Sequence, residues 1–261
     1  MDLTRIAVEQ SGRLCTITLN RPEKRNAIDD VMIAELRQAF TTAERTDAVR
    51  VVILTGAGPA FCAGADVAYL SKLSSHTFDE NKEDSLNLMR MFSQIYTLRK
   101  PVIAKVRGPA VAGGCGLVTA CDFAYAAEET AKFGYSEARI GFLPAIVMVF
   151  LIKRIGEGKA RELVLAGEQI NAAQAEKIGL ISKSIPERTL DDEVESFAHT
   201  ISEKNCPSSM ALSKEMFSKL DGLNFVDALE YAANMNALTR MTEDFKKGLQ
   251  SVLKKEPAPW L

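Results

Sequence analysis

Two glycine-rich segments contain the residues whose types and spacing are best suited to chemistry. They are TGAGPAFCAGAD (55–66) and AVAGGCGLVTACD (110–122), and each lies between an apolar run typical of a buried strand and a segment of helical character. Backbone N–H groups at a helix start have no partner within the helix and carry the positive end of its dipole. Two such turns that converge would stabilise a developing oxyanion, because small residues let a carbonyl approach the backbone closely. The alternative is that both segments are ordinary tight turns.

Other motifs that carry chemistry are absent from the sequence. GAGPAF (56–61) has Phe61 where a dinucleotide-binding fingerprint needs its third glycine, and GEGKA (156–160) lacks the Ser or Thr of a phosphate-binding loop. Neither GxSxG nor HExxH occurs. Only 2 histidines are present, which argues against a histidine-based triad. The 5 cysteines have no paired spacing, so we expect apolar packing in a reducing cytoplasm, with no disulfide and no metal site.

Composition indicates a globular protein with a substantial core. Of the 261 residues, 47% are hydrophobic and 25% are charged, and the formal net charge is −2. That balance argues against bulk attraction to nucleic acid or to an anionic membrane. No apolar run approaches the ~20 residues that a membrane-spanning helix needs. We therefore expect neither nucleic acid nor membrane as a partner, and a cytoplasmic location.

The elements that must position the two turns alternate between strands and helices in the first part of the chain. Period-two alternation and short continuous apolar runs predict strands at 15–19, 51–54, 102–106 and 123–126. Apolar residues at helical spacing predict one helix from about residue 30, with Asp29 or Asp30 as its cap, and another over 88–95.

The second part, from about residue 145, is mostly helical in pattern. One further strand is predicted at 180–185, and long amphipathic segments follow at 190–204, 208–220 and roughly 224–255. No low-complexity linker separates the two parts. We predict an α/β body and a helical tail that packs on the body or on a neighbouring subunit.

Four motifs, in this order and spacing, resemble the crotonase, or enoyl-CoA hydratase/isomerase, superfamily. They are NRPEKRNAI (20–28), TGAGPAFCAGAD (55–66), PVIAKVRGPAVAGGCGLVTACD (101–122) and FGYSEARIGFLPA (133–145), and the resemblance extends through TEDFKKGLQSVLKKEPAPW (242–260). It implies an α/β fold, with a spiral of ββα units over 1–195 for acyl-CoA binding and catalysis. It also implies a helical trimerisation region over 196–261, and a homotrimer or a hexamer built from two trimers.

The resemblance also implies the site. The oxyanion donors of the family map to the backbone N–H groups of Ala65 and Gly113, both within the two glycine-rich turns. Family hydratases usually carry two glutamates; the first position is Gly116 here, and the second is Glu137. No cofactor is implied beyond the coenzyme A of the substrate thioester.

One glutamate leaves three functions open. Glu137 could take a proton from water and return it to Cα on the same face, which is enoyl-CoA hydration. It could instead move a proton between C2 and C4, which is Δ3,Δ2-enoyl-CoA isomerisation, or the chain could bind acyl-CoA without catalysis. The motifs most resemble the methylglutaconyl-CoA hydratase-like branch, which implies a role in fatty acid metabolism or branched-chain amino acid catabolism. Arg139 could pair with the extra carboxylate of such a substrate, or face solvent.

Coenzyme A contacts are implied at several further positions. The adenine side maps to Lys24, Arg25 and the backbone of Ala27, and a phosphate contact is expected from Lys254 or Lys255, from the same or an adjacent subunit. Backbone contacts to the pantetheine arm map to Ala63, Ala65 and Asp66, whereas a lysine sometimes found two residues later is Ala68 here. The remaining residues expected at the substrate are Gly114 and Tyr135.

Overall fold

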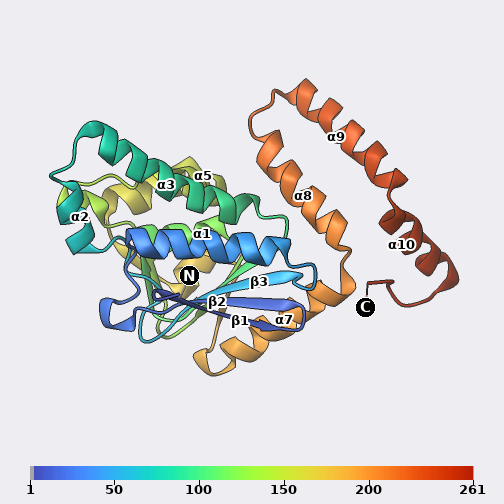
Figure 1. Ribbon diagram of the computed structural model, residues 1–261, viewed down its shortest axis with the longest axis horizontal. Coiled ribbons are helices and arrows are strands. Elements are labelled where there is room, and N and C mark those ends of the chain that lie inside the picture. The colour runs from blue at the N-terminus through green and yellow to red at the C-terminus, as the bar shows by residue number, and fades with distance from the viewer. Residues whose placement is uncertain (1–2, 261) are drawn as a thin grey trace.

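Six strands form the central sheet, in the order β1-β2-β3-β4-β6-β9 (Figure 1). The computed structural model of the chain describes residues 3–260. The strands are β1 (Ile6–Ser11), β2 (Leu14–Leu19), β3 (Val51–Gly56), β4 (Val102–Val106), β6 (Phe123–Ala127) and β9 (Lys183–Ile185). Strands β1 and β2 are antiparallel, and every later pair in this sheet is parallel. A second sheet has the order β5 (Pro109–Val111), β7 (Lys132–Gly134), β8 (Gln169–Asn171).

The continuous apolar run of β3 is explained by helices on both faces of the sheet. Val52 and Leu54 point into the larger core cluster, whereas Val51 and Ile53 point into the cluster that includes α7 (Leu190–Lys204). Figure 1 shows α1 (Asp30–Arg45) and α3 (Phe78–Thr97) on one side of the sheet and α7 on the other. Alternation along a strand covered on both faces therefore gives apolar residues at successive positions.

Sequence signals for the helices are largely confirmed. The carboxylate of Asp29 accepts the Met32 N–H at 2.8 Å, so Asp29 is the cap of α1 as predicted. The remaining helices of the core are α2 (Val67–Leu73), α4 (Gly113–Ala120), α5 (Ala145–Ala166), α6 (Ala172–Lys177) and the short 3-10 turns η1 (Pro22–Lys24), η2 (Glu137–Ile140) and η3 (Glu187–Thr189). The strand predicted at 180–185 is shorter than expected, because only Lys183–Ile185 pairs with β6.

The C-terminal segment consists of three helices that extend from the sheet (Figure 1). They are α8 (Pro207–Leu220), α9 (Phe225–Met241) and α10 (Glu243–Lys254). The predicted continuous segment 224–255 is broken at Thr242, whose hydroxyl accepts the Phe245 N–H and starts a new helix. The predicted division at residue 195 falls inside α7, which packs whole against the sheet, so the projecting segment begins after α7.

Large apolar side chains are exposed on these last helices, among them Phe217, Phe225, Val226, Met241, Val252 and Leu253. Helix α9 has no buried residue in this single chain. Such a surface is compatible with a helical tail that needs a partner. Within residues 3–260, no helix is long and apolar enough to cross a membrane.

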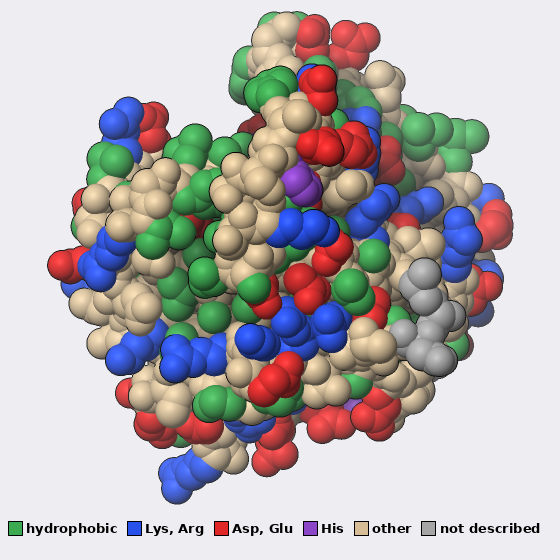
Figure 2. Space-filling view, turned by 60° about the vertical axis from the view of Figure 1, so that its left-hand side comes forward, with side chains coloured by type: hydrophobic (Ala, Val, Ile, Leu, Met, Phe, Trp, Pro, Cys, Tyr) green, Lys and Arg blue, Asp and Glu red, His purple; other side chains and the backbone are tan. Residues whose placement is uncertain are grey.

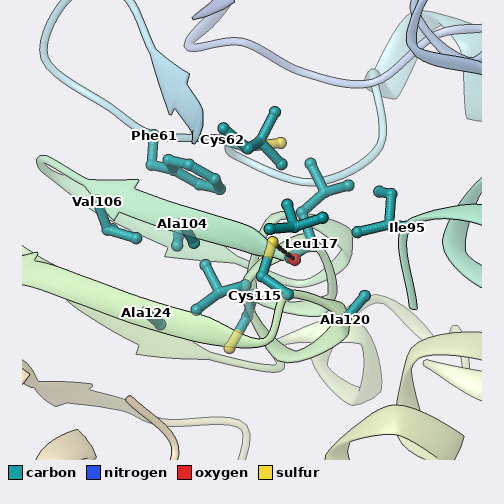
Figure 3. Packing of buried hydrophobic residues seen from close by; sticks show 14 of the residues in the cluster. Phe61, Cys62, Ile95, Ala104, Val106, Cys115, Leu117, Ala120 and Ala124 are labelled. Atoms are coloured by element: carbon teal, nitrogen blue, oxygen red, sulfur yellow. Dashed lines mark hydrogen bonds between the residues drawn. The ribbon is translucent and has the colours of Figure 1, made fainter. Parts of the chain in front are cut away.

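The main core cluster joins the two glycine-rich segments to the sheet. Figure 3 shows Phe61 and Cys62, from the loop after β3, in one cluster with Ala104 of β4 and with Cys115 and Leu117 of α4. All five cysteines are buried and free, as expected of small apolar residues in packing roles.

Candidate active site

Three parallel segments lie in register beside one another and set the geometry of the site. Cys62 pairs with Ala110 in an isolated bridge, and Ala110 pairs with Phe133 between β5 and β7. The bridge is held by the Cys62 N–H, donated to Pro109 O at 3.1 Å, and by the Val111 N–H, donated to Cys62 O at 2.9 Å. The three chains therefore run in the same direction and leave this row at the same edge.

The predicted site residues follow directly beyond that edge. Ala65 and Gly113 each lie three residues past the row, and Glu137 lies four residues past it. The Ala112 N–H is donated to Gly134 O at 2.8 Å, which keeps the second and third chains together up to the turn. Strand register, rather than proximity in sequence, brings these three residues together.

The N–H of Ala65 faces away from its neighbouring chain. Ile28 pairs with Ala65 in a parallel bridge: the Ile28 N–H is donated to Gly64 O, and the Asp66 N–H to Ile28 O, both at 2.8 Å. In this pattern the polar groups of the middle residue point to the opposite side. Within residues 3–260 no protein oxygen accepts the Ala65 N–H, so this amide is available to a ligand.

The N–H of Gly113 is aimed by an unusual backbone conformation. Ala112, directly before α4, has φ 52° and ψ −124°, a region that a residue with a side chain seldom occupies. Gly64 also has positive φ, and a Cβ on it would lie 2.8 Å from Ala112 Cβ and 3.4 Å from Gly113 N. Close approach of the two turns thus requires glycine at residue 64. The Gly113 amide is the first of α4 and has no protein acceptor within the described residues.

Glu137 begins η2 and is only 7% exposed. Its Oε2 is buried and has no hydrogen-bond partner among the described residues. Burial raises the pKa of this carboxyl above its usual value, and a backbone hydrogen bond opposes that shift only in part. A buried carboxyl with a raised pKa is suited both to accept and to return a proton.

Val147 occupies the space in which a side chain at residue 116 would stand. A Cβ on Gly116 would lie 2.2 Å from Val147 Cγ1, 2.7 Å from Val147 Cβ and 3.3 Å from the Phe92 ring. Both neighbours are buried, and they come from α5 and α3. The missing first acid is therefore replaced by an apolar wall, and a glutamate does not fit there unless Val147 moves.

Other titratable groups beside α4 are poorly suited to proton transfer. Burial raises the pKa of the Cys115 thiol to about 12, so a thiolate nucleophile is disfavoured. Tyr135 is fully buried and packs in the main core, and burial raises the pKa of its phenol well above the usual value. Its side chain is thus enclosed in the core, so a direct contact with substrate stays a prediction. Glu137 stands out as the group that can exchange protons.

The first group of candidate coenzyme contacts consists of exposed basic side chains. Lys24 and Arg25 are exposed on and just after η1, on a loop whose Ile28 pairs with Ala65. Figure 2 turns the side of the molecule that carries α2 forward and shows Lys and Arg side chains in a band across it. Exposed cations on this loop suit the phosphates of coenzyme A.

Several predicted main-chain contacts are already used within the chain. Ala63 donates its N–H to Arg25 O at 3.0 Å, Asp66 donates its N–H to Ile28 O, and the Ala27 oxygen accepts from Arg21 at 2.9 Å. Of the residues expected at the pantetheine arm, Ala65 keeps a free N–H. Gly114 has a packing role, since a Cβ there would lie 2.2 Å from Cys62 O.

Lys254 is found in α10, and Arg139 lies beside the C-terminal end of α5. Figure 1 shows α10, which carries Lys254, on the opposite side of the molecule from α2, so a phosphate contact from Lys254 or Lys255 requires another subunit. Arg139 is exposed, and its Nε and Cγ lie 3.3 and 3.5 Å from a Cβ built on Gly167, at the C-terminal end of α5. A cation at a helix C-terminus is favourable without any ligand.

A cavity of about 1150 Å³ lies elsewhere, between the core and the C-terminal helices. It is lined by side chains such as Phe150, Met210, Phe217 and Leu249, and none of the two amides, Gly116 or Glu137 borders it. This cavity lies between the core and α8 and α10, so it is separate from the candidate active site.

Sequence reasoning missed Val147 and Phe92 as the residues that fill the place of the first acid. No local signal in the sequence predicts how α5, which carries Val147, packs against α4. Arg21 was also missed, because a charged residue in a polar loop is usually solvated; here it is buried.

Comparisons with known proteins identify the family. A family model described as enoyl-CoA hydratase/isomerase matches residues 9–261. A protein of Thermus thermophilus provisionally named enoyl-CoA hydratase is 40% identical over 248 residues, or 95% of this chain and 97% of that protein. The crotonyl-CoA hydratase of Syntrophomonas wolfei is 33% identical, with 98% and 97% covered. The crystal structure of an enoyl-CoA hydratase from Shewanella pealeana matches with TM-score 0.93 at 30% identity, covering 99% and 96%.

Proposed function

Since this chain belongs to the enoyl-CoA hydratase/isomerase family and is an enzyme of that family, we propose that it adds water reversibly to the α,β double bond of an acyl-CoA thioester, with Glu137 as its single acid and base. The observation that carries the proposal is the common edge beyond which two amides, unpaired among residues 3–260, and one buried carboxyl follow. The amides of Ala65 and Gly113 would take up the negative charge that develops on the thioester oxygen.

The proposed reaction proceeds as a proton circuit through Glu137. The carboxylate takes a proton from water while the water oxygen bonds to Cβ, and the electron pair of the double bond moves onto the thioester as an enolate. The protonated Glu137 then returns its proton to Cα, which restores the thioester carbonyl. Removal of one amide donor of this kind typically costs ~10²–10³ in rate, so the two turns supply much of the barrier reduction.

A single carboxyl implies addition to one face of the substrate. The position of the first acid, at Gly116, is filled by the side chain of Val147 and the ring of Phe92, which neither activate water nor deliver protons. Both the oxygen and the returned proton would therefore arrive from the side of Glu137.

The same observation favours a second candidate, Δ3,Δ2-enoyl-CoA isomerisation. Moving a proton between C2 and C4 needs one carboxyl and no bound water, and the apolar side chains at the position of the first acid offer no polar group to hold water. The two candidates share their machinery and differ in whether oxygen from water enters the product.

The substrate and the assembly are further proposals. A methylglutaconyl-CoA-like substrate rests on the sequence pattern around Glu137, whereas the position of Arg139 at the end of α5 gives it no support. A trimer or hexamer is supported by the exposed apolar side chains of α8, α9 and α10.

The test offers crotonyl-CoA and 3-methylglutaconyl-CoA and follows the loss of enoyl-thioester absorbance. Glu137→Gln should lower kcat by ~10²–10⁴ because general acid–base catalysis is lost, while the affinity for coenzyme A esters is retained. Glu128→Gln is the matched control, since its side chain is exposed. Equal activity of wild type and Glu137→Gln on every enoyl-CoA would reject the proposal.

A further inference from the structure

A buried arginine joins the loop 20–28 to the turn that presents the Ala65 amide. Arg21 is 8% exposed, and its Nη2 lies 3.0 Å from Asp66 Oδ2 while its Nη1 lies 3.0 Å from Asp29 Oδ2. The same Nη1 donates to Ala27 O at 2.9 Å. One guanidinium thus bridges two carboxylates and one carbonyl from two places along the chain, residues 27–29 and residue 66.

Asp66, directly after Ala65, is fixed by these contacts on both of its oxygens. Its Oδ1 caps α2 by accepting the N–H groups of Ala68 at 2.8 Å and Tyr69 at 3.3 Å, and its Oδ2 accepts from Arg21. Burial opposes the charge of Asp66, but the hydrogen bonds and the arginine outweigh burial and lower its pKa. The carboxylate therefore stays charged and keeps the residue after Ala65 in place.

Asn26 makes a second connection between the same two loops. It is completely buried, accepts the Arg21 N–H at 2.8 Å, and donates from Nδ2 to Ala57 O and Ala60 O, both at 2.8 Å. Together with the backbone bonds of Ile28, these contacts leave the turn before Ala65 little freedom.

We propose that Arg21 is a positioning residue for the Ala65 amide, a role that rests on the proposed function of that amide as an oxyanion donor. The loop 20–28 then has a second task besides exposing Lys24 and Arg25 to the coenzyme: its buried side holds one half of the oxyanion hole. A displacement of about 1 Å in a catalytic group can cost ~10²-fold in rate. Loss of the bridge should therefore reduce turnover rather than binding.

Three variants test this inference. Arg21→Met removes the bridge. Arg21→Lys keeps a positive charge beside the two carboxylates and so is less prone to unfold, but its single ammonium group cannot reproduce the planar contacts of the guanidinium to both. Arg5→Met is the matched control, because Arg5 also pairs with Asp29, at 3.0 Å, but has no contact with Asp66 among the described residues. We expect kcat to fall ~10–100-fold in both Arg21 variants with KM within about 3-fold of wild type, and no such loss for Arg5→Met.

A spectroscopic readout separates positioning from general damage. Crotonyl-CoA labelled with 13C at the thioester carbonyl is bound to protein in which Glu137→Gln prevents turnover, and its C=O stretch is measured by infrared difference spectroscopy. Two aligned donors should shift this band to lower frequency than in water, and Arg21→Lys should lose part of the shift. A full shift in Arg21→Lys, or an equal loss in Arg5→Met, overturns the inference. If the band is unshifted before any change at Arg21, the oxyanion role of Ala65 itself is wrong.

Discussion

Gly116 and Val147 share one space: a Cβ on Gly116 would lie 2.2 Å from Val147 Cγ1 and 2.7 Å from Val147 Cβ. Gly116 lies one turn after Gly113 in α4, and Val147 lies in the first turn of α5, so the contact is part of the packing between these two helices. The packing of α5 against α4 therefore leaves no room for an acidic side chain at residue 116.

This contact predicts a strong coupling between the two positions. Gly116→Ala should destabilise the protein by about 1–3 kcal/mol through overpacking. In Gly116→Ala/Val147→Gly the clash is removed, and the double variant should be more stable than the sum of the single effects by about 0.5–3 kcal/mol. Urea unfolding of the four proteins measures the coupling, and additive free energies would show that the two side chains do not compete.

The raised pKa of Glu137 predicts a specific pH dependence of activity. Hydration needs the carboxylate to take a proton from water, so kcat/KM should fall on the acid side with an apparent pKa above the ordinary glutamate value of 4.5. A pH profile from 4 to 9 with crotonyl-CoA measures it. A midpoint at or below 4.5 would contradict the burial of the active carboxyl.

The raised pKa of Glu137 also predicts that its ionised form destabilises the folded protein. Because the folded state holds this proton more tightly than the unfolded state, Glu137 favours folding below its unfolded pKa and loses that contribution as pH rises through the folded pKa. Glu137→Gln should therefore be more stable than wild type at pH 7, and the difference should vanish near pH 4. Thermal unfolding at the two pH values checks the sign.

Adjacent glycines of α4 should respond differently to alanine. A Cβ on Gly113 would meet Ile28 Cδ1 at 3.5 Å, an ordinary contact, whereas one on Gly114 would meet Cys62 O at 2.2 Å. Gly113→Ala should keep its melting temperature within a few degrees, and Gly114→Ala should lose stability markedly. Similar melting temperatures for the two variants would contradict the described packing.

The exposed basic residues after β2 should act on the coenzyme and not on the acyl group. Lys24→Ala/Arg25→Ala should raise KM for crotonyl-CoA by about 10-fold, since two cations near phosphate are lost. The matched N-acetylcysteamine thioester has no phosphate and should be unaffected. Equal changes for both substrates would assign these residues to the structure of the loop.

Local signals in the sequence predicted most of the central sheet and the long helices, but not β1, β5, β7, β8 or α2. Burial on both faces predicts β3, and the side chain of Asp29 predicts the start of α1, because each signal depends on residues close in the chain. The break at Thr242 was missed, since apolar spacing continues across it and a single hydroxyl cap decides it.

The candidate site was predictable only in its parts. Ala65, Gly113 and Glu137 could be named from motifs, but their meeting depends on the row formed by Cys62, Ala110 and Phe133, which is a long-range register. The position of Val147 depends on how α5 packs against α4, and the burial of Arg21 depends on two distant carboxylates. Neither has a local sequence signal.

The most direct test of the account follows oxygen. Wild-type protein is incubated with crotonyl-CoA in water enriched in 18O and deuterium, and the 3-hydroxyacyl product is analysed by mass spectrometry and NMR. One 18O at Cβ and one deuteron at Cα on the same face would agree with a lone carboxyl acting from one side. A parallel incubation in the same water uses a 3-enoyl-CoA. Its conversion to the 2-enoyl isomer, with no uptake of 18O into either substrate, would contradict the account.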